Sequence, residues 1–298
     1  MQNRDTFSSY HPMVNFVFFA LVLGCTMFFM HPVSLCISMV SAFVYSLYLK
    51  GWKTVRFSLL YLLPMMVMTA VLNPAFSHEG VTILTYLPSG NPLTLESILF
   101  GIGAAGMLAA VVLWFSCYTE VMTSDKFVYL FGRILPALSL LLSMTLRFVP
   151  KFQVQFRVVR EGQKCVGRDL SDGNILTRMK QTVTIFSIMV TWALENAIET
   201  ADSMRSRGYG LKGRTAFSIY RFDSRDKWVM VWLLFCGAVI LGGAILGHLD
   251  WRYFPTIKGT AASIWPVMIQ LIYFALCSTP VFLNRREDRK WNCLRSEI

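Results

Sequence analysis

Long apolar runs without charged residues dominate the hydrophobic pattern of this chain. Six such runs occur, each 16 to 22 residues long, and a helix that rises 1.5 Å per residue needs about 17 to 25 residues to cross a membrane. They occupy residues 14–30, 33–49, 57–72, 97–118, 228–247 and 263–283. We therefore predict six transmembrane helices, the first two joined by a hairpin at His31 and Pro32, where proline prevents a continuous helix.

Lysine and arginine are distributed unevenly around these runs. When the six runs are threaded through a membrane, 26 of the 28 basic residues fall on one side, and 17 of them lie between Glu120 and Lys227. Basic residues accumulate on the cytosolic side of membrane proteins. We therefore expect a multi-pass membrane protein whose N-terminus, C-terminus and central domain face the cytoplasm.

A seventh apolar run, from Phe127 to Leu146, also resembles a membrane span by hydropathy. If it crossed the membrane, the 15 basic residues that follow it would move to the outside, against the charge rule. Arg133 and Pro136 lie near its middle, and a lone charge there costs about 2.5 to 3.5 kcal/mol in lipid. We interpret this run as one helix at the cytosolic face, begun by the capping residues at 123–125.

The predicted organisation is an all-α polytopic membrane protein with an inserted cytosolic helical domain. Its three parts are an N-terminal membrane region of four spans at 1–118, the inserted domain at 119–227, and a C-terminal membrane region with a basic tail at 228–298.

Two amphipathic helices are predicted inside the inserted domain. Residues 151–166 place four apolar side chains on one face, those of Phe152, Phe156, Val159 and Val166. After a polar turn at 169–174, a longer helix begins near Ile175 and reaches Met204. It carries an unbroken stripe at three-four spacing, formed by residues 179, 183, 186, 190, 194, 197, 201 and 204. We interpret most positions of both stripes as internal packing. The longer helix, about 45 Å at 1.5 Å per residue, is nevertheless expected to reach a partner.

Composition agrees with a membrane protein. The chain has 298 residues, of which 55% are hydrophobic, and a mean hydropathy of +0.51. The core of one soluble domain of this length cannot bury so many apolar side chains. The net charge of +11 follows from orientation in the membrane, and we expect no nucleic-acid partner. The seven cysteines show no Cys-x-x-Cys spacing, so we expect reduced thiols and no disulfide framework.

The C-terminal end of the longer helix is the most specific feature. The segment ADSMRSRGYG (201–210) carries two arginines and then a glycine that can end a helix in the left-handed conformation. Arg207 is thereby held at a helix end, where its planar guanidinium group can bind a carboxylate with two hydrogen bonds. Taken alone, the same residues also fit ordinary positive charge on the cytosolic side.

The surroundings of Arg207 resemble the T component of energy-coupling factor (ECF) transporters, the family that includes the membrane subunit of cobalt importers. The resemblance rests on TSDKFVYLFGRILPALSLLLSMTLRFVPKF (123–152), on WALENAIETADSMRSRGYG (192–210), on Asn73-Pro74 and on Thr94-Leu95-Glu96, and so covers essentially the whole chain. Within this match, Arg133, Pro136, Arg147 and Pro150 are candidate structural residues of the coupling domain.

The resemblance implies two coupling helices whose ends dock in grooves of two ATP-binding cassette ATPase subunits. The second end comprises Arg205, Ser206, Arg207 and Gly208. The first end, within GQKCVGRD (162–169), comprises Lys164, Val166, Gly167 and Arg168. Here Val166 stands where the family commonly has arginine, so either Lys164 or Arg168 is a candidate source of the charge.

The function implied is energy coupling in an ATP-driven importer of a vitamin or trace metal ion, with a small substrate-binding membrane subunit as a further partner. The chain lacks a G-x-x-x-x-G-K-[ST] loop, so we expect ATP and magnesium in the partners, no cofactor here and no catalysis. The four histidines are scattered without ligand spacing, and no span carries a charge. We therefore expect neither a metal site nor a substrate site.

Two other classes remain as alternatives. An integral membrane enzyme acting on lipid would cluster acids and histidines near the headgroups, and Glu195 and Glu199 are the only close acidic pair on the longer helix. A self-contained secondary transporter would show internal repeats and charged or broken helices at mid-membrane, and neither is found in the sequence.

Overall fold

The computed structural model is an all-α protein with two small β-hairpins. It describes residues 5–77, 79–86, 92–132, 136–168, 174–211, 220–259 and 264–296. The chain divides into two compact units. Residues 1–127 and 220–298 form the first, which we call the membrane unit, and residues 128–219 form the second, the inserted unit. The two are described separately below.

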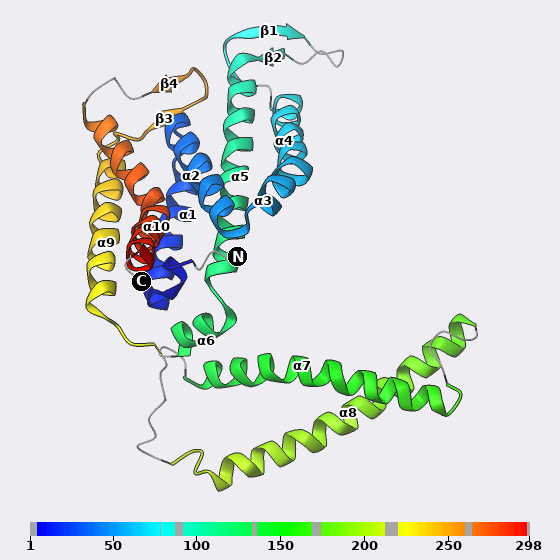
Figure 1. The fold of residues 1–298 in the computed structure, drawn as a ribbon. Helices are drawn as coiled ribbons and strands as arrows, with labels where there is room; N and C mark the ends of the chain where they lie inside the picture. The colour runs from blue at the N-terminus through cyan, green and yellow to red at the C-terminus, as the bar shows by residue number, and fades with distance from the viewer. Residues whose placement is uncertain are drawn as a thin grey trace. The chain divides into compact units, whose positions relative to one another are not determined.

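The membrane unit is a helical bundle (Figure 1). Its helices are α1 (Pro12–Phe28), α2 (Pro32–Lys50), α3 (Trp52–Phe57), the π-helical turn η2 (Ser58–Leu62), α4 (Leu63–Phe76), α5 (Leu95–Val121), α9 (Ser224–Ile245) and α10 (Ile264–Ser296), preceded by a short 3-10 helix, η1 (Phe7–Ser9). Strand β1 (Ile83–Tyr86) pairs antiparallel with β2 (Pro92–Thr94), and β3 (Trp251–Arg252) pairs with β4 (Lys258–Gly259).

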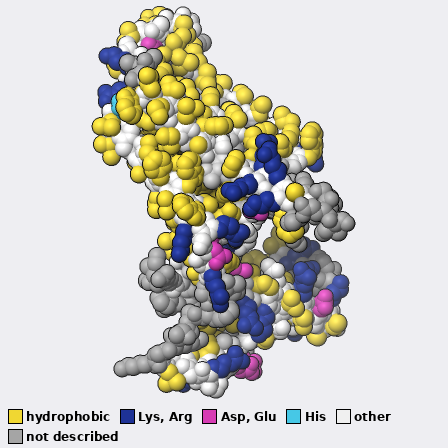
Figure 2. Space-filling model, turned by 60° about the vertical axis from the view of Figure 1, so that its left-hand side comes forward, with side chains coloured by type: hydrophobic (Ala, Val, Ile, Leu, Met, Phe, Trp, Pro, Cys, Tyr) yellow, Lys and Arg dark blue, Asp and Glu magenta, His cyan; other side chains and the backbone are white. Residues whose placement is uncertain are grey.

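The six predicted spans coincide with helices of this unit. Five are long and apolar enough to cross a membrane, with α3, η2 and α4 acting as one 25-residue helix, and α1 is a shorter apolar helix of 17 residues. The all-α polytopic fold is therefore confirmed. Hydrophobic side chains cover the middle of the membrane unit on the face shown in Figure 2, as expected of a surface that meets lipid tails.

Proline and histidine set the start of the first two helices. Pro12 and Pro32 each occupy the first helical position, where a missing N–H costs nothing. The preceding side chains complete the caps, because Nδ1 of His11 accepts from the Met13 N–H at 3.2 Å and Nδ1 of His31 accepts from the Val33 N–H at 3.3 Å. The hairpin predicted at His31 and Pro32 follows from this arrangement.

The core of the membrane unit is built around one tryptophan of α5. Trp114 is fully buried and lies edge-on to Phe18 and Phe19 of α1, with ring centroids 5.7 and 6.3 Å away. Its Nε1–H donates to Oγ of Ser38 in α2 at 3.0 Å. This single side chain therefore joins three helices, through aromatic packing and a hydrogen bond that satisfies its polar group.

The inserted unit differs from the prediction at its beginning. The single helix expected over 127–146 is wrong: α6 (Ser124–Gly132), whose first residues belong to the membrane unit, ends before α7 (Pro136–Cys165) begins. Pro136 starts α7 at a position that tolerates proline, and Ser139 Oγ of α7 donates to the Val128 carbonyl of α6 at 3.2 Å.

Helix α7 also replaces the separate helix expected over 151–166, since it continues through Pro150 to Cys165. Proline inside a helix removes one backbone hydrogen bond, and Pro150 is exposed on α7. The predicted longer helix is confirmed as α8 (Ile175–Ser206). The polar turn predicted at 169–174 lies outside the described residues except for Asn174.

The orientation of the inserted unit can be tested with one native thiol. Cys165 is exposed at the end of α7, and Thr85 is exposed in the hairpin β1–β2. In a variant that keeps only Cys165, an impermeant thiol reagent should label the protein only after cells are permeabilised. In a cysteine-free variant, Thr85→Cys should be labelled in intact cells. Labelling of Cys165 in intact cells would contradict a cytosolic inserted unit.

Candidate functional site

Helices α7 and α8 cross, and a polar and aromatic contact fixes the crossing point. The rings of Phe152 and Trp192 meet edge to face at 5.3 Å. Lys151 Nζ donates to Oδ1 of Asn196 at 2.9 Å and lies 5.5 Å from the Trp192 ring centroid. Figure 1 shows the crossed pair, with the C-terminal ends of the two helices at opposite ends. The contact thus gives two long helices a defined mutual angle.

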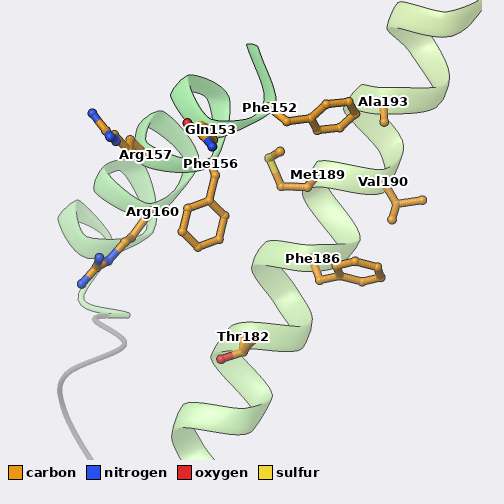
Figure 3. Close-up of a pocket in the computed structure, with 10 residues that line it drawn as sticks. All are labelled: Phe152, Gln153, Phe156, Arg157, Arg160, Thr182, Phe186, Met189, Val190 and Ala193. Carbon is orange, nitrogen blue, oxygen red and sulfur yellow. The ribbon is translucent and has the colours of Figure 1, made fainter. Parts of the chain in front are cut away.

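An apolar groove of about 590 Å³ lies beside this crossing. Figure 3 shows Phe156 of α7 pointing toward α8, while Arg157 and Arg160 project away from the groove. The groove is lined by Phe152, Gln153, Phe156, Arg157, Arg160, Thr182, Phe186, Met189, Val190 and Ala193. An open, mostly apolar groove with cations at one rim fits an apolar segment of another molecule better than a polar solute.

The apolar stripe predicted on α8 is exposed, so its interpretation as internal packing is wrong. Met179, Val183 and Phe186 keep 60%, 65% and 69% of their surface accessible. The face of α8 that packs inside the unit is a second stripe, which includes the buried Ile185 and Met189. Helix α8 is therefore apolar on two faces, of which one contacts α7 and one is available to a partner.

The C-terminal end of α8 carries Arg207 in a tightly closed turn. Gly208 has a φ of +77°, its N–H donates to the Arg205 carbonyl at 3.0 Å, and the Tyr209 N–H donates to the Met204 carbonyl at 3.0 Å. This closure satisfies carbonyls at the helix end. It also places Arg207, which is exposed, at the tip of a long rigid element.

The C-terminal end of α7 closes in the same way. Gly167 has a φ of +76°, its N–H donates to the Lys164 carbonyl at 3.0 Å, and the Arg168 N–H donates to the Gln163 carbonyl at 2.9 Å. Position by position, Gly167 therefore corresponds to Gly208, and Val166 corresponds to Arg207. The exposed Val166 occupies the place that arginine occupies at the other end.

The equivalence also places the remaining candidates of the two ends. Lys164 corresponds to Arg205, and Arg168 corresponds to Tyr209. Lys164 and Arg168 are both exposed; Lys164 lies two residues before Val166, and Arg168 directly follows Gly167. Ser206 caps its own helix end, because its Oγ donates to the Ser203 carbonyl at 2.9 Å.

The other candidates lie along α7. Arg147 and Pro150 are exposed on the helix, Pro136 is its first residue, and Arg133 lies outside the described residues. In the described ranges, no group of three or more His, Cys, Asp and Glu residues could hold a metal ion. Glu195 and Glu199, the acidic pair considered for an enzyme, are both exposed on α8.

Sequence reasoning missed the groove and the crossing contact. Lys151 and Asn196 lie 45 positions apart, so their hydrogen bond has no local signature. A partial signal was present in α8, where Ile185, Met189 and Trp192 repeat at spacings of four and three. Two apolar faces on one helix indicate that it packs on both sides.

Comparison with known proteins supports a family assignment. A family model described as cobalt transport protein (CbiQ) matches residues 6–217. An ECF transporter transmembrane protein (EcfT) of Lactococcus lactis is 34% identical over 95 residues, covering 32% of this chain and 36% of that protein. A homologous protein, EcfT 1, of Listeria monocytogenes is 36% identical over 108 residues, covering 35% of this chain and 40% of that protein.

A longer match has lower identity. The EcfT protein of Bacillus selenitireducens is 28% identical over 207 residues, covering 65% of this chain and 74% of that protein. The chain thus spans about two fifths of the Lactococcus and Listeria relatives and about three quarters of this one. Because the family model covers most of the chain, from before α1 to beyond α8, the chain belongs to the CbiQ family of transport proteins, which includes the T components of ECF transporters.

Proposed function

We propose that this chain is the energy-coupling membrane subunit of an ATP-driven ECF-type importer. The observation that carries the proposal is the pair of matching helix ends on crossed helices, each closed by a left-handed glycine and located at opposite ends of the pair (Figure 1). Two equivalent tips on one rigid element suit two equivalent partners. We assign these partners as two ATP-binding cassette ATPase subunits.

Each tip would dock in a groove of one ATPase. At the second tip, Arg207 pairs with an acidic residue of the ATPase through both arms of its guanidinium. At the first tip, the exposed Val166 makes an apolar contact instead, and Lys164 and Arg168 on either side supply the charge. The two docking contacts are therefore similar in backbone shape and different in electrostatics.

The groove beside the crossing, together with the exposed stripe of α8, would hold the small substrate-binding membrane subunit. Its apolar lining suits a helix of a protein that is itself embedded in lipid. When the ATPases close on ATP, they would move the two tips, and the crossed helices would carry this movement to the groove. Lys151, Asn196 and Trp192 keep the crossing angle during that movement.

The transported substrate would be a vitamin or a trace metal ion, bound by the separate subunit and not by this chain. The family description names cobalt transport, and the curated relatives are named as energy-coupling factor proteins. In this arrangement the inserted unit and both termini face the cytoplasm, and the chain needs no cofactor of its own.

The assignment of ATP hydrolysis to the partner subunits gives a direct test. Because the chain has no phosphate-binding loop, the purified chain should show no ATPase activity and no high-affinity vitamin or metal uptake in vesicles. Adding its copurifying ATPases should restore hydrolysis. Robust hydrolysis by the purified chain, in a preparation shown by mass spectrometry to be free of other ATPases, would contradict the proposal.

A further inference from the structure

The chain passes twice between the membrane unit and the inserted unit. The outgoing passage follows α5 and reaches Phe127, and the return passage begins at Tyr220 and enters α9. A short segment near the N-terminus, Asp5–His11, contacts residues of both passages. We call this segment the N-terminal clamp.

The outgoing passage is held through Lys126. This side chain is only 7% exposed, and its Nζ donates to the Ser8 carbonyl of the clamp and to the Val121 carbonyl at 2.8 Å. Burial lowers the pKa of the Lys126 ammonium, and the nearby Asp5 carboxylate opposes that shift. A buried ammonium needs such partners, because an unpaired buried charge is strongly unfavourable.

The return passage is held through three residues around the start of α9. The His11 N–H donates to Oδ1 of Asp226 at 3.4 Å, and the His11 ring lies 4.9 Å from the ring of Phe222. The guanidinium of Arg225 lies 4.7 Å from the ring centroid of Tyr10, within cation–π distance. Asp226 is 2% exposed and also accepts from the Asp223 N–H in the capping box of α9.

The clamp is itself fixed to the helical bundle. The Phe7 N–H donates to Oδ1 of Asn284 in α10 at 3.0 Å, and Nδ2 of the same side chain donates to Asp5. Tyr45 of α2 donates to Oδ2 of Asp5 at 3.2 Å. The fully buried Phe7 ring packs against Phe18 of α1 at 5.2 Å. Three helices thus hold the segment that in turn holds both passages.

We propose that the N-terminal clamp is a positioning element that ties the outgoing and return passages to one fixed point of the membrane unit. A lever transmits displacement only when its pivot is fixed, and two loose linkers would absorb the movement of the inserted unit. The clamp supplies that pivot through Lys126 on one side and His11 and Tyr10 on the other. Its role in transport rests on the proposed function, whereas the clamping itself does not.

The test combines a structural readout with a functional one. Lys126→Met keeps the length of the side chain and removes its two hydrogen bonds, and Asn284→Ala detaches the clamp from α10 without altering either passage. The control is Lys53→Met, at an exposed position of α3. Amide hydrogen exchange is measured on the purified full chain in peptides covering 119–128 and 220–228, and uptake per ATP hydrolysed is measured on the complex.

Both variants should accelerate exchange in both passages by about tenfold or more, the effect of losing hydrogen bonds that involve a charged or buried group. Uptake per ATP hydrolysed should fall several-fold while the ATPases still copurify. The control should match the wild type in all three readouts. If Lys126→Met accumulates poorly in the membrane, the exchange and uptake measurements on Asn284→Ala test the clamp proposal instead.

Two results would overturn the proposal. Unchanged exchange at 220–228 in both variants would show that the clamp does not join the two passages. Faster exchange at both passages with unchanged uptake per ATP would show that the clamp is structural and does not position the pivot. If the wild-type preparation contains no ATPases, the proposed function fails, and the exchange measurement still decides whether the clamp joins the passages.

Discussion

Arg207→Glu is expected to abolish substrate uptake and to prevent the ATPases from copurifying, while the variant chain is still inserted into the membrane in normal amounts. Arg207 is exposed at the tip of α8 in a turn closed by Gly208, and we propose that it meets an acidic residue of an ATPase. Breaking one side of a partly buried charge pair costs about 2 to 5 kcal/mol, because the remaining charge is left unpaired. Reversing the charge adds repulsion. Copurification and substrate uptake in the same cells measure the effect.

Two further variants separate a specific contact from general charge. Arg207→Lys should be only partly tolerated, because lysine keeps the positive charge but lacks the planar guanidinium that forms two parallel hydrogen bonds with a carboxylate. Lys180→Glu reverses an exposed charge near the other end of the same helix and should leave assembly intact. If Arg207→Glu transports normally with its full complement of ATPases, this arginine is ordinary positive charge on the cytosolic side and the docking role is wrong.

Phe186→Glu should release the substrate-binding membrane subunit and leave the ATPases bound. Phe186 lines the groove and keeps 69% of its surface accessible, so the substitution leaves the fold of the inserted unit largely unaffected. An aromatic residue at the centre of an apolar interface contributes about 2 kcal/mol or more, which corresponds to roughly thirtyfold weaker binding. A buried carboxylate there costs further free energy. Uptake should fall accordingly.

The matched control is a position on another face of α8. Thr191 is exposed, does not line the groove and lies on a different face from the stripe, so Thr191→Glu adds the same charge outside the proposed interface and should be neutral. Retention of the substrate-binding subunit in Phe186→Glu would show that the groove contacts something else. Loss of both the ATPases and the substrate-binding subunit would indicate disruption of the whole inserted unit, against a local docking role.

The sequence predicted the membrane spans well because lipid imposes a strong and local constraint. A span must be apolar over its whole length, and its ends show as prolines and charges. Pro12, Pro32 and the capping residues near Ser124 lie where the structure begins helices. The end of α8 was equally visible, since Gly208 follows Arg207 directly and its left-handed conformation ends the helix.

The division between α6 and α7 was not predictable from hydropathy. Arg133 is the one charged residue of the run 127–146, and only the position of Pro136 indicates a boundary. Proline occurs both inside helices and at their first position, and this chain uses both, since Pro136 begins α7 and Pro150 lies within it. Sequence spacing alone does not separate these two uses.

The faces of α8 were assigned incorrectly for a related reason. A stripe at three-four spacing predicts an apolar face but does not say what covers it. In this chain the stripe through Met179 and Phe186 is exposed, while Ile185 and Met189 pack inside. The contacts of the N-terminal clamp lay beyond sequence reasoning altogether, because Phe7 and Asn284 are 277 positions apart.

The most direct test of the account is purification of the tagged chain from its native membrane in mild detergent, followed by identification and stoichiometry of the copurifying proteins. The account predicts two ATP-binding cassette ATPase subunits and one small polytopic membrane protein for each copy of this chain. It also predicts that the Arg207→Glu preparation lacks the ATPases. A wild-type chain that purifies without ATPases, in a preparation competent for transport, would contradict the coupling role.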